Sequence, residues 1–390
     1  MSSIHATGQY HRTSVAGEQV RAFVPNPLPR KTVVDLSGST GFLLGQAAEA
    51  VARLDGVASV LPDPLIFLYS FVRKEAQLSS QIEGTQSSLS ELLAYESAEA
   101  PGVPMDDVLE VANYVAALEH GVARIRGGFP LSNRLLREIH SILLRSGRGA
   151  ASLPGEFRRS QNWIGGTRPG NAHFVPAPIQ EVMPCMGDLE LFLHQTKGEL
   201  PPLVVAAMAH VQFETIHPFL DGNGRVGRLL ITLLLTERGV LREPLLYLSL
   251  WLKSHRDVYY QKLDGVRIDG NWQGWFEFFL EGVRESAASA VQTAQRLLKL
   301  FDQDQAKLQA SGRIAGNVLR VHGELKRKVI VSVPGLSSEL SLAAPTVNRA
   351  LQKLVLHGIA REISGRKRGR QWAYSDYLQI LSEGTEPYSN

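Results

Sequence analysis

The sequence predicts a mainly α-helical chain in which β structure is confined to one hairpin and to a C-terminal wing. Apolar residues recur at helical spacing through most of residues 41–299, and Gly or Pro separates the successive segments. Residues 153–178 differ, because they are rich in Gly and Pro and contain short β-prone pieces. The unit from Gly312 to Ile380 reads helix, helix, turn, helix and then two short strands around a basic turn.

Each predicted helix rests on its apolar periodicity and on the signals at its ends. Asp63-Pro64 marks a helix start, because Asp caps the first turn and Pro suits the first helical position. Pro201-Pro202 opens a later helix in the same way. The predicted helices of this block are Gly41–Leu54, Leu65–Ile82, Ser87–Ser97, Met105–Ile125, Ser132–Leu144, Ile179–Gln195, Leu203–Ile216, Arg225–Arg238, Ser254–Val266 and Trp272–Lys299.

Two segments lack helical periodicity. Residues 1–40 are rich in Gly, Pro, Ser and Thr and are expected to form an extended arm over the surface. Gln303–Ser311 is polar and is expected to be a linker. These breaks divide the chain into an N-terminal arm and helical region at 1–110, a core at 111–300 and a C-terminal unit at 312–385.

Composition and charge restrict the class of protein. The chain has 390 residues, of which 44% are hydrophobic, and its formal net charge of +3 is too small to imply a nucleic-acid partner. The single cysteine, Cys185, excludes an intrachain disulfide, so a reducing, cytoplasmic compartment is expected. No apolar run reaches the length of a membrane span, and residues 1–10 lack the apolar stretch of a secretory signal.

The stretch from His217 to Arg228 reads His-Pro-Phe-Leu-Asp-Gly-Asn-Gly-Arg-Val-Gly-Arg and joins two predicted helices. Gly222 and Gly224 allow positive φ and close approach of a ligand to the backbone. Their amides, with the first free amides of the next helix, can form a nest for an anion. Arg225 and Arg228 lie three residues apart on that helix, so both can face the same phosphates.

Two further side chains of this stretch can do chemistry beside that anion. Asp221 can hold a divalent cation next to phosphates, and His217 can accept a proton near neutral pH. Phosphoryl and nucleotidyl transfer need this combination, because their catalysis consists mostly of positioning and charge neutralisation. The alternative is an ordinary helix–helix turn capped by His217, but the His, the Asp and the two Arg at fixed places favour the chemical interpretation.

The same stretch resembles the signature of the Fic family, His-Pro-Phe-x-Asp/Glu-Gly-Asn-Gly-Arg-x-x-Arg, with every specified position filled. The resemblance extends over roughly residues 30–290 and implies a Fic-type helical bundle. It also implies transfer of AMP from ATP to a protein hydroxyl, with His217 as the base, Asp221 as the Mg²⁺ ligand and Phe219 as a buried anchor. The ATP-binding residues that it implies in this stretch are Gly222, Asn223, Gly224, Arg225, Val226, Gly227 and Arg228.

The segment Ser79–Gly84 closes the second predicted helix. Ser79 and Glu83 share one helix face, and Gly84 suits a helix C-cap. A carboxylate at a helix C-terminus is unfavourable unless it meets a cation, although a solvated surface Glu is the alternative. The segment resembles the family's inhibitory motif, Ser/Thr-x-x-x-Glu-Gly/Asn, which implies that Glu83 pairs with Arg228 and blocks the position of the γ-phosphate.

Residues 162–175 resemble the family's flap, whose exposed strand pairs with an extended segment of the target protein. Trp163-Ile164-Gly165-Gly166 and Phe174-Val175-Pro176 carry this resemblance, which places Ile164 beside the nucleotide; a plain surface hairpin is the alternative.

Two pairs of aromatic residues follow the signature. Tyr259 and Tyr260 match a Tyr pair that the family places near the adenine and ribose. We expect one of them to pack inside and the other to line the pocket. Trp272 and Trp275 are expected to lie in the core.

Residues 334–375 resemble a winged-helix domain with a basic wing. Leu336–Leu340 and Pro345–His357 form a helix-turn-helix pattern, and Ile359–Ile363 and Gln371–Ser375 flank the wing. In such folds the second helix enters the major groove and the wing contacts phosphate, whereas docking of a protein or a second copy is the alternative. The candidate DNA-binding residues are Thr346, Asn348, Arg349, Arg366, Lys367, Arg368 and Arg370.

These observations lead to two functional hypotheses. The first is a protein adenylyltransferase that uses ATP and Mg²⁺, modifies a Ser, Thr or Tyr hydroxyl of a target protein or of itself, and is restrained by Glu83. The second is a transcription regulator whose core senses nucleotide while the C-terminal unit binds DNA. Both can hold in one chain, and a homodimer, another donor and removal of AMP by the same site stay open.

Overall fold

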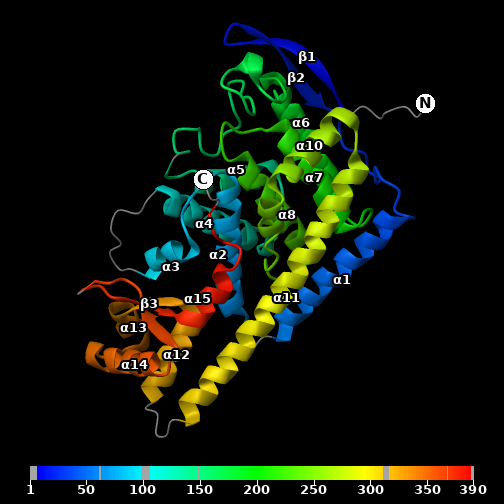
Figure 1. Ribbon diagram of the computed structural model, residues 1–390. Helices are drawn as coiled ribbons and strands as arrows, with labels where there is room; N and C mark the ends of the chain where they lie inside the picture. Colours follow the sequence, from blue (N-terminus) through cyan, green and yellow to red (C-terminus); the bar gives the residue numbers. More distant parts are fainter. Residues whose placement is uncertain are drawn as a thin grey trace.

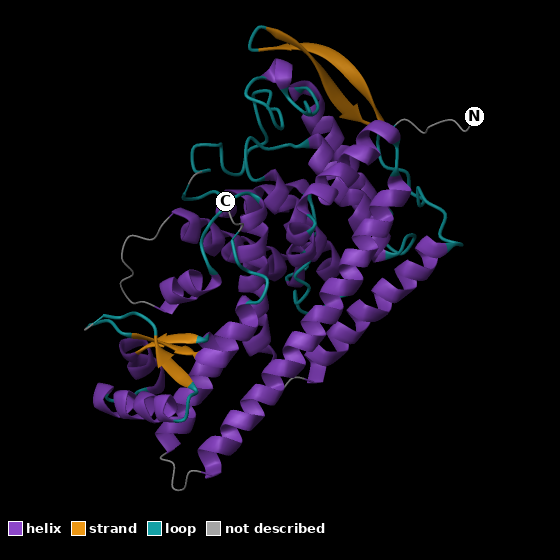
Figure 2. Cartoon of the chain, viewed as in Figure 1, coloured by secondary structure: helices purple, strands orange, loops and turns teal. Residues whose placement is uncertain are grey.

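The computed structural model describes residues 7–60, 63–97, 106–147, 149–310, 316–366 and 368–387. Helices dominate these residues, and the strands among them form one two-stranded and one three-stranded sheet. Figures 1 and 2 show a helical body with the N-terminal hairpin at one end and the C-terminal unit at the other. The mainly α fold is thus confirmed.

The centre of the body is the antiparallel pair α7 (Pro202–Ile216) and α8 (Asn223–Glu237). Residues Leu203–Ile216 are buried on every side, as expected for a helix that is apolar all round. A second pair, α1 (Ser39–Val60) and the long α11 (Trp272–Ala310), packs along the edge of the body (Figure 1). The remaining helices of the body are α2 (Pro64–Ile82), α3 (Leu89–Ser97), α4 (Asp106–Arg126), α5 (Asn133–Leu143), α6 (Ile179–Gln195), α9 (Ser249–Ser254) and α10 (Arg256–Asp269).

The expectation of an extended N-terminal arm is wrong. Strands β1 (Gly8–Val15) and β2 (Glu18–Pro25) form an antiparallel hairpin. Ala16 and Gly17 make its two-residue turn, both at positive φ, which is the geometry that matches the twist of the strands. The Phe23 N–H donates to the Val175 carbonyl at 2.9 Å, so the hairpin supports the Gly/Pro-rich segment of residues 153–178.

One expectation about a helix boundary is also wrong. No linker lies at residues 303–310, because α11 continues to Ala310; Ser311 lies outside the described residues. Asp304 is buried and accepts a hydrogen bond from the Tyr374 hydroxyl at 2.9 Å, so tertiary contact fixes the polar end of the helix. The predicted helix Ser254–Val266 corresponds to α10, which runs from Arg256 to Asp269, and the short α9 that ends at Ser254 was not foreseen.

The hairpin expected within residues 153–178 is smaller than predicted. Its β pairing is a single bridge between Ile164 and Phe174, next to a short 3₁₀ turn at Pro169–Asn171.

The C-terminal unit consists of helices around a three-stranded antiparallel sheet with the order β3-β5-β4. The predicted helix-turn-helix and the two strands after it are present, whereas β3 and α15 were not foreseen. The DNA-binding role of the unit stays a prediction. Its elements are α12 (Gly316–Lys328), β3 (Ile330–Ser332), α13 (Val333–Leu340), α14 (Ala344–Leu356), β4 (Ala360–Glu362), β5 (Gln371–Tyr374) and α15 (Ser375–Ser382).

Helix α2 of the body contacts helices α12 and α15 of the C-terminal unit (Figure 1). Lys74 on α2 donates to the Glu383 carbonyl at 2.9 Å, and Gln81 donates to the Thr385 carbonyl at 2.8 Å. The end of the chain therefore holds α2 in place. No helix in the described part of the chain combines the length and apolar character needed to cross a membrane.

Candidate active site

The loop between α7 and α8 has a fixed backbone. His217 ends α7 in the left-handed region (φ 51°, ψ 61°), and Gly222 precedes α8 at φ 77°. The Asn223 side chain closes the loop, since its Oδ1 accepts from the Phe219 N–H and its Nδ2 donates to the Phe219 carbonyl, both at 2.8 Å. Phe219 is fully buried and stacks on His140 at 3.7 Å between ring centroids, as an anchor should.

A cavity of about 550 Å³ opens beside this loop. Its wall brings together seven of the predicted site residues: Glu83, Ile164, His217, Gly224, Arg228, Tyr259 and Tyr260. Four wall residues that the sequence analysis missed are Glu214, Arg256, Asp264 and Arg267. The signal for Glu214 was available, because a carboxylate three residues before the candidate base interrupts a strongly apolar helix.

His217 is held neutral in the wall of this cavity. Burial and the nearby guanidinium groups of Arg267 and Arg158 together lower the pKa of His217 to about 3. Its Nδ1 is buried without a hydrogen-bond partner in the described part of the chain. The imidazole is therefore unprotonated at neutral pH, which is the state that a general base needs.

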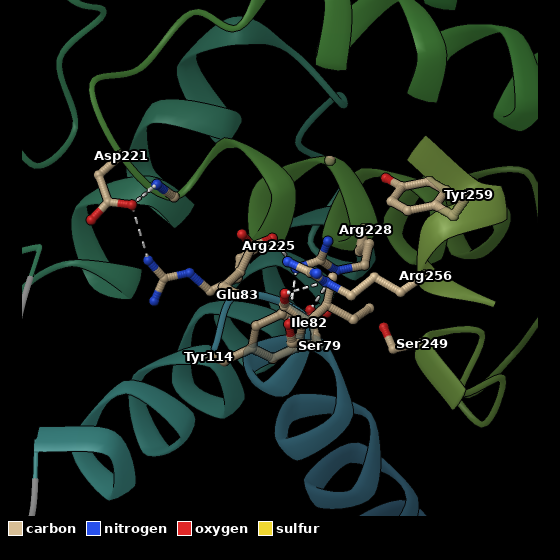
Figure 3. A network of polar contacts seen from close by, with 12 residues as sticks. Ser79, Ile82, Glu83, Tyr114, Asp221, Arg225, Arg228, Ser249, Arg256 and Tyr259 are labelled. Carbon is tan, nitrogen blue, oxygen red and sulfur yellow. Dashed lines mark hydrogen bonds and ion pairs between the residues drawn. The ribbon is translucent and has the colours of Figure 1, made fainter. Parts of the chain in front are cut away.

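Arg228 is bound to the end of α2, as Figure 3 shows. Its guanidinium donates to the Glu83 Oε1 at 2.7 Å, to the Ser79 Oγ at 2.8 Å and to the Ser79 carbonyl at 2.9 Å. Burial would raise the pKa of Glu83, but Arg228 outweighs that effect and lowers it. A Cβ on Gly224 would lie 2.2 Å from the Glu83 Oε1, so this carboxylate fills the space over the glycine. Gly84 follows at φ 100°, the left-handed conformation expected after a helix end.

Asp221 and Arg225 lie outside the cavity wall, on the other side of the α8 N-terminus (Figure 3). Arg225 is buried and pairs with Glu110 at 3.2 Å and with Asp221 at 3.4 Å, so the expectation that Arg225 and Arg228 face one ligand is wrong for this conformation. Asp221 is 45% exposed, and its Oδ1 accepts the Gly222 N–H at 2.6 Å.

The described residues hold no cluster of three His, Cys, Asp or Glu side chains able to bind a metal ion. The single exposed carboxylate of Asp221 nevertheless fits Mg²⁺, which takes one or two carboxylates and completes its shell with phosphate oxygens and water.

Three other predicted ATP-binding residues support the loop but do not line the cavity. Asn223 closes the loop, Val226 is buried in the core, and Gly227 packs against Glu214. They position the site without lining the cavity.

The expectation that one tyrosine of the pair packs inside and the other lines the pocket is confirmed for Tyr259 and Tyr260 respectively, although the buried Tyr259 also reaches the cavity wall. Tyr259 is buried and its hydroxyl donates to the His210 Nε2 at 2.8 Å, since the His210 Nδ1 donates to the Gly227 carbonyl at 3.0 Å. Tyr260 is 37% exposed, and burial raises its pKa to about 12. Trp275 is buried and Trp272 half-buried, in agreement with their expected place in the core.

Two protein-family models match regions that contribute residues to the cavity wall. The sequence model of the Fic/DOC family N-terminal region matches residues 42–123, and that of the Fic/DOC family matches residues 130–235. The chain thus contains the N-terminal and Fic domains of the Fic/DOC family. Both matched regions contribute to the cavity, the first through Glu83 and the second through His217 and Arg228.

Named relatives of this Fic chain include two insect proteins. It is 32% identical over 213 residues to the protein adenylyltransferase Fic of Culex quinquefasciatus, a match that covers 51% of this chain and 38% of that protein. It is 37% identical over 128 residues to the protein of the same name from Aedes aegypti, covering 33% of this chain and 23% of that protein. The matches thus span well under half the length of these relatives.

Solved structures of Fic proteins share the fold. A Fic family protein from Desulfovibrio desulfuricans G20 superposes with a TM-score of 0.58 at 22% identity, covering 89% of this chain and 98% of that one. A Fic domain containing signaling protein from Bacteroides thetaiotaomicron VPI-5482 gives a TM-score of 0.52 at 20% identity, covering 65% and 97%.

The flap candidate of this Fic chain, residues 162–175, is held by side chains. His173 Nε2 contacts the Asp264 Oδ2 at 2.6 Å, and Asp264 also pairs with Arg267 at 3.1 Å. Arg168 reaches Glu18 on the N-terminal hairpin at 2.8 Å. The flap thus borders the cavity and is fastened to α10 on one side and to β2 on the other.

The candidate DNA-binding residues of the Fic chain are distant from this cavity in the sequence and in the fold (Figure 1). Thr346 is half-buried, and Asn348 and Arg349 on α14 are exposed. The wing arginines Arg366, Arg368 and Arg370 are exposed, whereas Lys367 lies outside the described residues.

Proposed function

We propose that this chain is a protein adenylyltransferase that transfers AMP from ATP to a Ser, Thr or Tyr hydroxyl of a protein. One observation carries the proposal: a neutral His217 shares a cavity wall with Gly224 and Arg228, at the N-terminus of α8. The similarity to proteins named adenylyltransferase supports ATP as the donor.

The residues divide the work of the transfer. His217 takes the proton of the acceptor hydroxyl, whose oxygen then attacks the α-phosphorus of ATP. The bond to the β-phosphate oxygen breaks, and pyrophosphate leaves. Arg228 and the amides at the start of α8 neutralise the phosphates, and Asp221 would hold Mg²⁺, whose charge adds to this neutralisation.

The same geometry supports self-restraint. Glu83 pairs with Arg228 and fills the space over Gly224. It therefore competes with phosphate oxygens for this cation and for this space. An anionic carboxylate there also repels the triphosphate. We therefore include autoinhibition by Glu83 in the proposal.

The test uses ATP labelled on the α-phosphate, Mg²⁺ and three variants of the whole chain. Glu83→Gly is expected to acquire label on itself or on added protein, with a mass increase of one AMP. Adding His217→Ala should reduce the labelling by about 10²–10⁴-fold, the usual contribution of a general base. Adding His194→Ala instead, at an exposed histidine of α6, should change nothing. Equal labelling with and without His217 would disprove the proposal.

The flap is the proposed docking place of the target protein. Its segment 162–175 has one backbone bridge, between Ile164 and Phe174, at the edge of the cavity that contains His217. An extended peptide paired there would bring its hydroxyl toward the imidazole.

DNA binding by the C-terminal unit is a second candidate function. It is supported by the exposed wing arginines and by the exposed Asn348 and Arg349 of the second helix. Replacing Arg366, Arg368 and Arg370 with Gln should abolish salt-dependent binding to duplex DNA. The same replacement of the exposed Arg53, Arg134 and Arg159 on the body is the matched control, and His217→Ala should have no effect. Equal binding by the two triple variants would exclude this function.

A further inference from the structure

Three carboxylates line the cavity, and one of them has no cationic partner. Glu83 pairs with Arg228, and Asp264 pairs with His173 and Arg267. Glu214 forms no ion pair within the described part of the chain, and its Oε1 has no hydrogen-bond donor there. Because a buried acceptor without a donor costs free energy, this arrangement calls for a donor from outside the protein.

Glu214 is placed by the helices on both sides of the signature loop. It lies on α7, three residues before His217, and is only 6% exposed. A Cβ on Gly227 would come within 2.2 Å of the Glu214 Oε1, so the glycine lets the carboxylate lie against α8.

Two polar side chains close to Glu214, His210 and Tyr259, have their donor hydrogens engaged elsewhere. His210 uses one ring nitrogen to donate to the Gly227 carbonyl and the other to accept from Tyr259. The hydroxyl hydrogen of Tyr259 is therefore already engaged.

The position of Glu214 indicates which part of a nucleotide it would meet. The charges that act on it are Arg228 and Glu83, at the phosphate end, and Arg267. It acts in turn on Tyr259, at the nucleoside end. Burial raises the pKa of Glu214 to about 7. A carboxylate repels phosphate but accepts readily from neutral hydroxyls, and the group between triphosphate and base is the ribose.

We propose that Glu214 accepts a hydrogen bond from a ribose hydroxyl of the bound nucleotide and thereby selects ribonucleotides over deoxyribonucleotides. The inference rests on the proposed use of ATP. It assigns to Glu214 a role in recognition that is separate from the proton transfer by His217.

The experiment measures binding by calorimetry, without any transfer reaction. Glu83→Gly and Glu83→Gly/Glu214→Gln chains are titrated with ATP, 2′-deoxy-ATP, 3′-deoxy-ATP and inosine triphosphate. The single variant should bind ATP about tenfold more tightly than one of the two deoxy analogues, as expected for a hydrogen bond to a carboxylate. In the double variant the affinities for ATP and for that deoxy analogue should differ by no more than about twofold. The affinity for inosine triphosphate relative to ATP should be the same in both variants.

Each other outcome overturns the proposal in a recognisable way. Equal ribose preference in both variants, or equal weakening of all four nucleotides, excludes the contact with the ribose. A Glu214-dependent loss against inosine triphosphate moves the contact to the amino group of adenine. Absence of any ATP binding by the Glu83→Gly chain would overturn both this inference and the proposed function, whereas tight binding without preference overturns this inference alone.

A second variant keeps the carboxylate and displaces it. Gly227→Ala places a Cβ where the Glu214 Oε1 now lies, so it should abolish the same preference. Thermal unfolding of each variant shows that the chain is folded. A Gly227→Ala chain that is folded and still prefers ribose would contradict the proposal.

Discussion

The signature loop and the flap border one cavity but are built in opposite ways. In the loop, residues 217–228, buried side chains fix the backbone, as Asn223 does for both polar groups of Phe219. In the flap, residues 162–175, one β bridge and contacts of exposed side chains such as Arg168 hold the chain. The first arrangement resists change, whereas the second is easily remodelled.

This difference agrees with the role that we propose for each region. A base and an anion nest must keep their positions to within fractions of an ångström, so they are placed at the ends of two core helices. A surface that pairs with an extended peptide must adapt to it, and weak contacts allow that. In the proposed function, packing therefore fixes the position of the reacting groups, and the flap selects the target.

The sharpest test of this contrast uses one carbonyl that both regions bind. The Phe219 carbonyl accepts from Asn223 in the loop at 2.8 Å and from Asn162 at the start of the flap at 2.9 Å. Asn223→Ala also strands the buried Phe219 N–H, so it should lower the free energy of unfolding by roughly 2–3 kcal/mol. Asn162→Ala leaves the carbonyl bonded and should cost about 1 kcal/mol or less. Urea denaturation compares the two, and equal losses would refute the contrast.

The proposed inhibition by Glu83 gives the next largest expected effect, which is on the rate of AMP transfer. Glu83→Gly frees Arg228 and the space over Gly224, and the rate of AMP transfer should rise about tenfold, equivalent to roughly 1.4 kcal/mol. Glu83→Gln is the matched control, because it keeps a hydrogen-bond acceptor for Arg228 but removes the charge, and it should give a smaller rise. Initial rates with labelled ATP measure both. A Gln variant as active as the Gly variant would show that charge alone causes the inhibition.

A pH dependence of stability tests how deeply the site is buried. The folded pKa of Glu214 is raised to about 7 from an ordinary 4.5, so the folded chain holds a proton that the unfolded chain has lost. The stability that this group contributes is full below pH 4.5 and is lost as the pH rises through 7. Glu214→Gln should therefore raise the unfolding temperature at pH 8 by a few degrees relative to wild type, and by less at pH 5. The same difference at both pH values would mean that Glu214 does not titrate in this range.

The smallest effect on stability is expected in the flap. Arg168→Ala breaks an exposed ion pair with Glu18, so the free energy of unfolding should change by less than about 1 kcal/mol. The KM for the target protein should rise while the affinity for ATP stays the same. Arg53→Ala, which breaks another exposed ion pair far from the cavity, should leave both constants unchanged. A loss of ATP affinity in Arg168→Ala would show that the flap belongs to the nucleotide site.

The sequence predicted the helical core and most of the loop, because both depend on local signals. Helix ends such as Asp63-Pro64 and Gly84 are marked by residue type, and Gly222 allows the positive φ that the loop adopts there. The pairing of Glu83 with Arg228, which only the resemblance implied, is present at 2.7 Å.

What the sequence did not predict depends on contacts between distant segments. The N-terminal hairpin turns at Ala16-Gly17, which lacks the usual Asn-Gly signal, and it gains support from Val175, far along the chain. Helix α11 continues through a polar stretch because Asp304 meets Tyr374. Arg225 faces Glu110 instead of the cavity because a buried carboxylate from α4 lies on that side. None of these partners can be read from the neighbouring sequence.

Because the backbone of His217 is left-handed, thermal stability and the proposed activity favour different residues at position 217. A residue with a Cβ at φ 51° carries about 1–2 kcal/mol of strain that glycine does not. A library screened only for survival of heating would therefore enrich glycine at this position, and one screened for labelled product would retain histidine. The fold alone thus favours glycine at residue 217, whereas the proposed role as a base requires the imidazole.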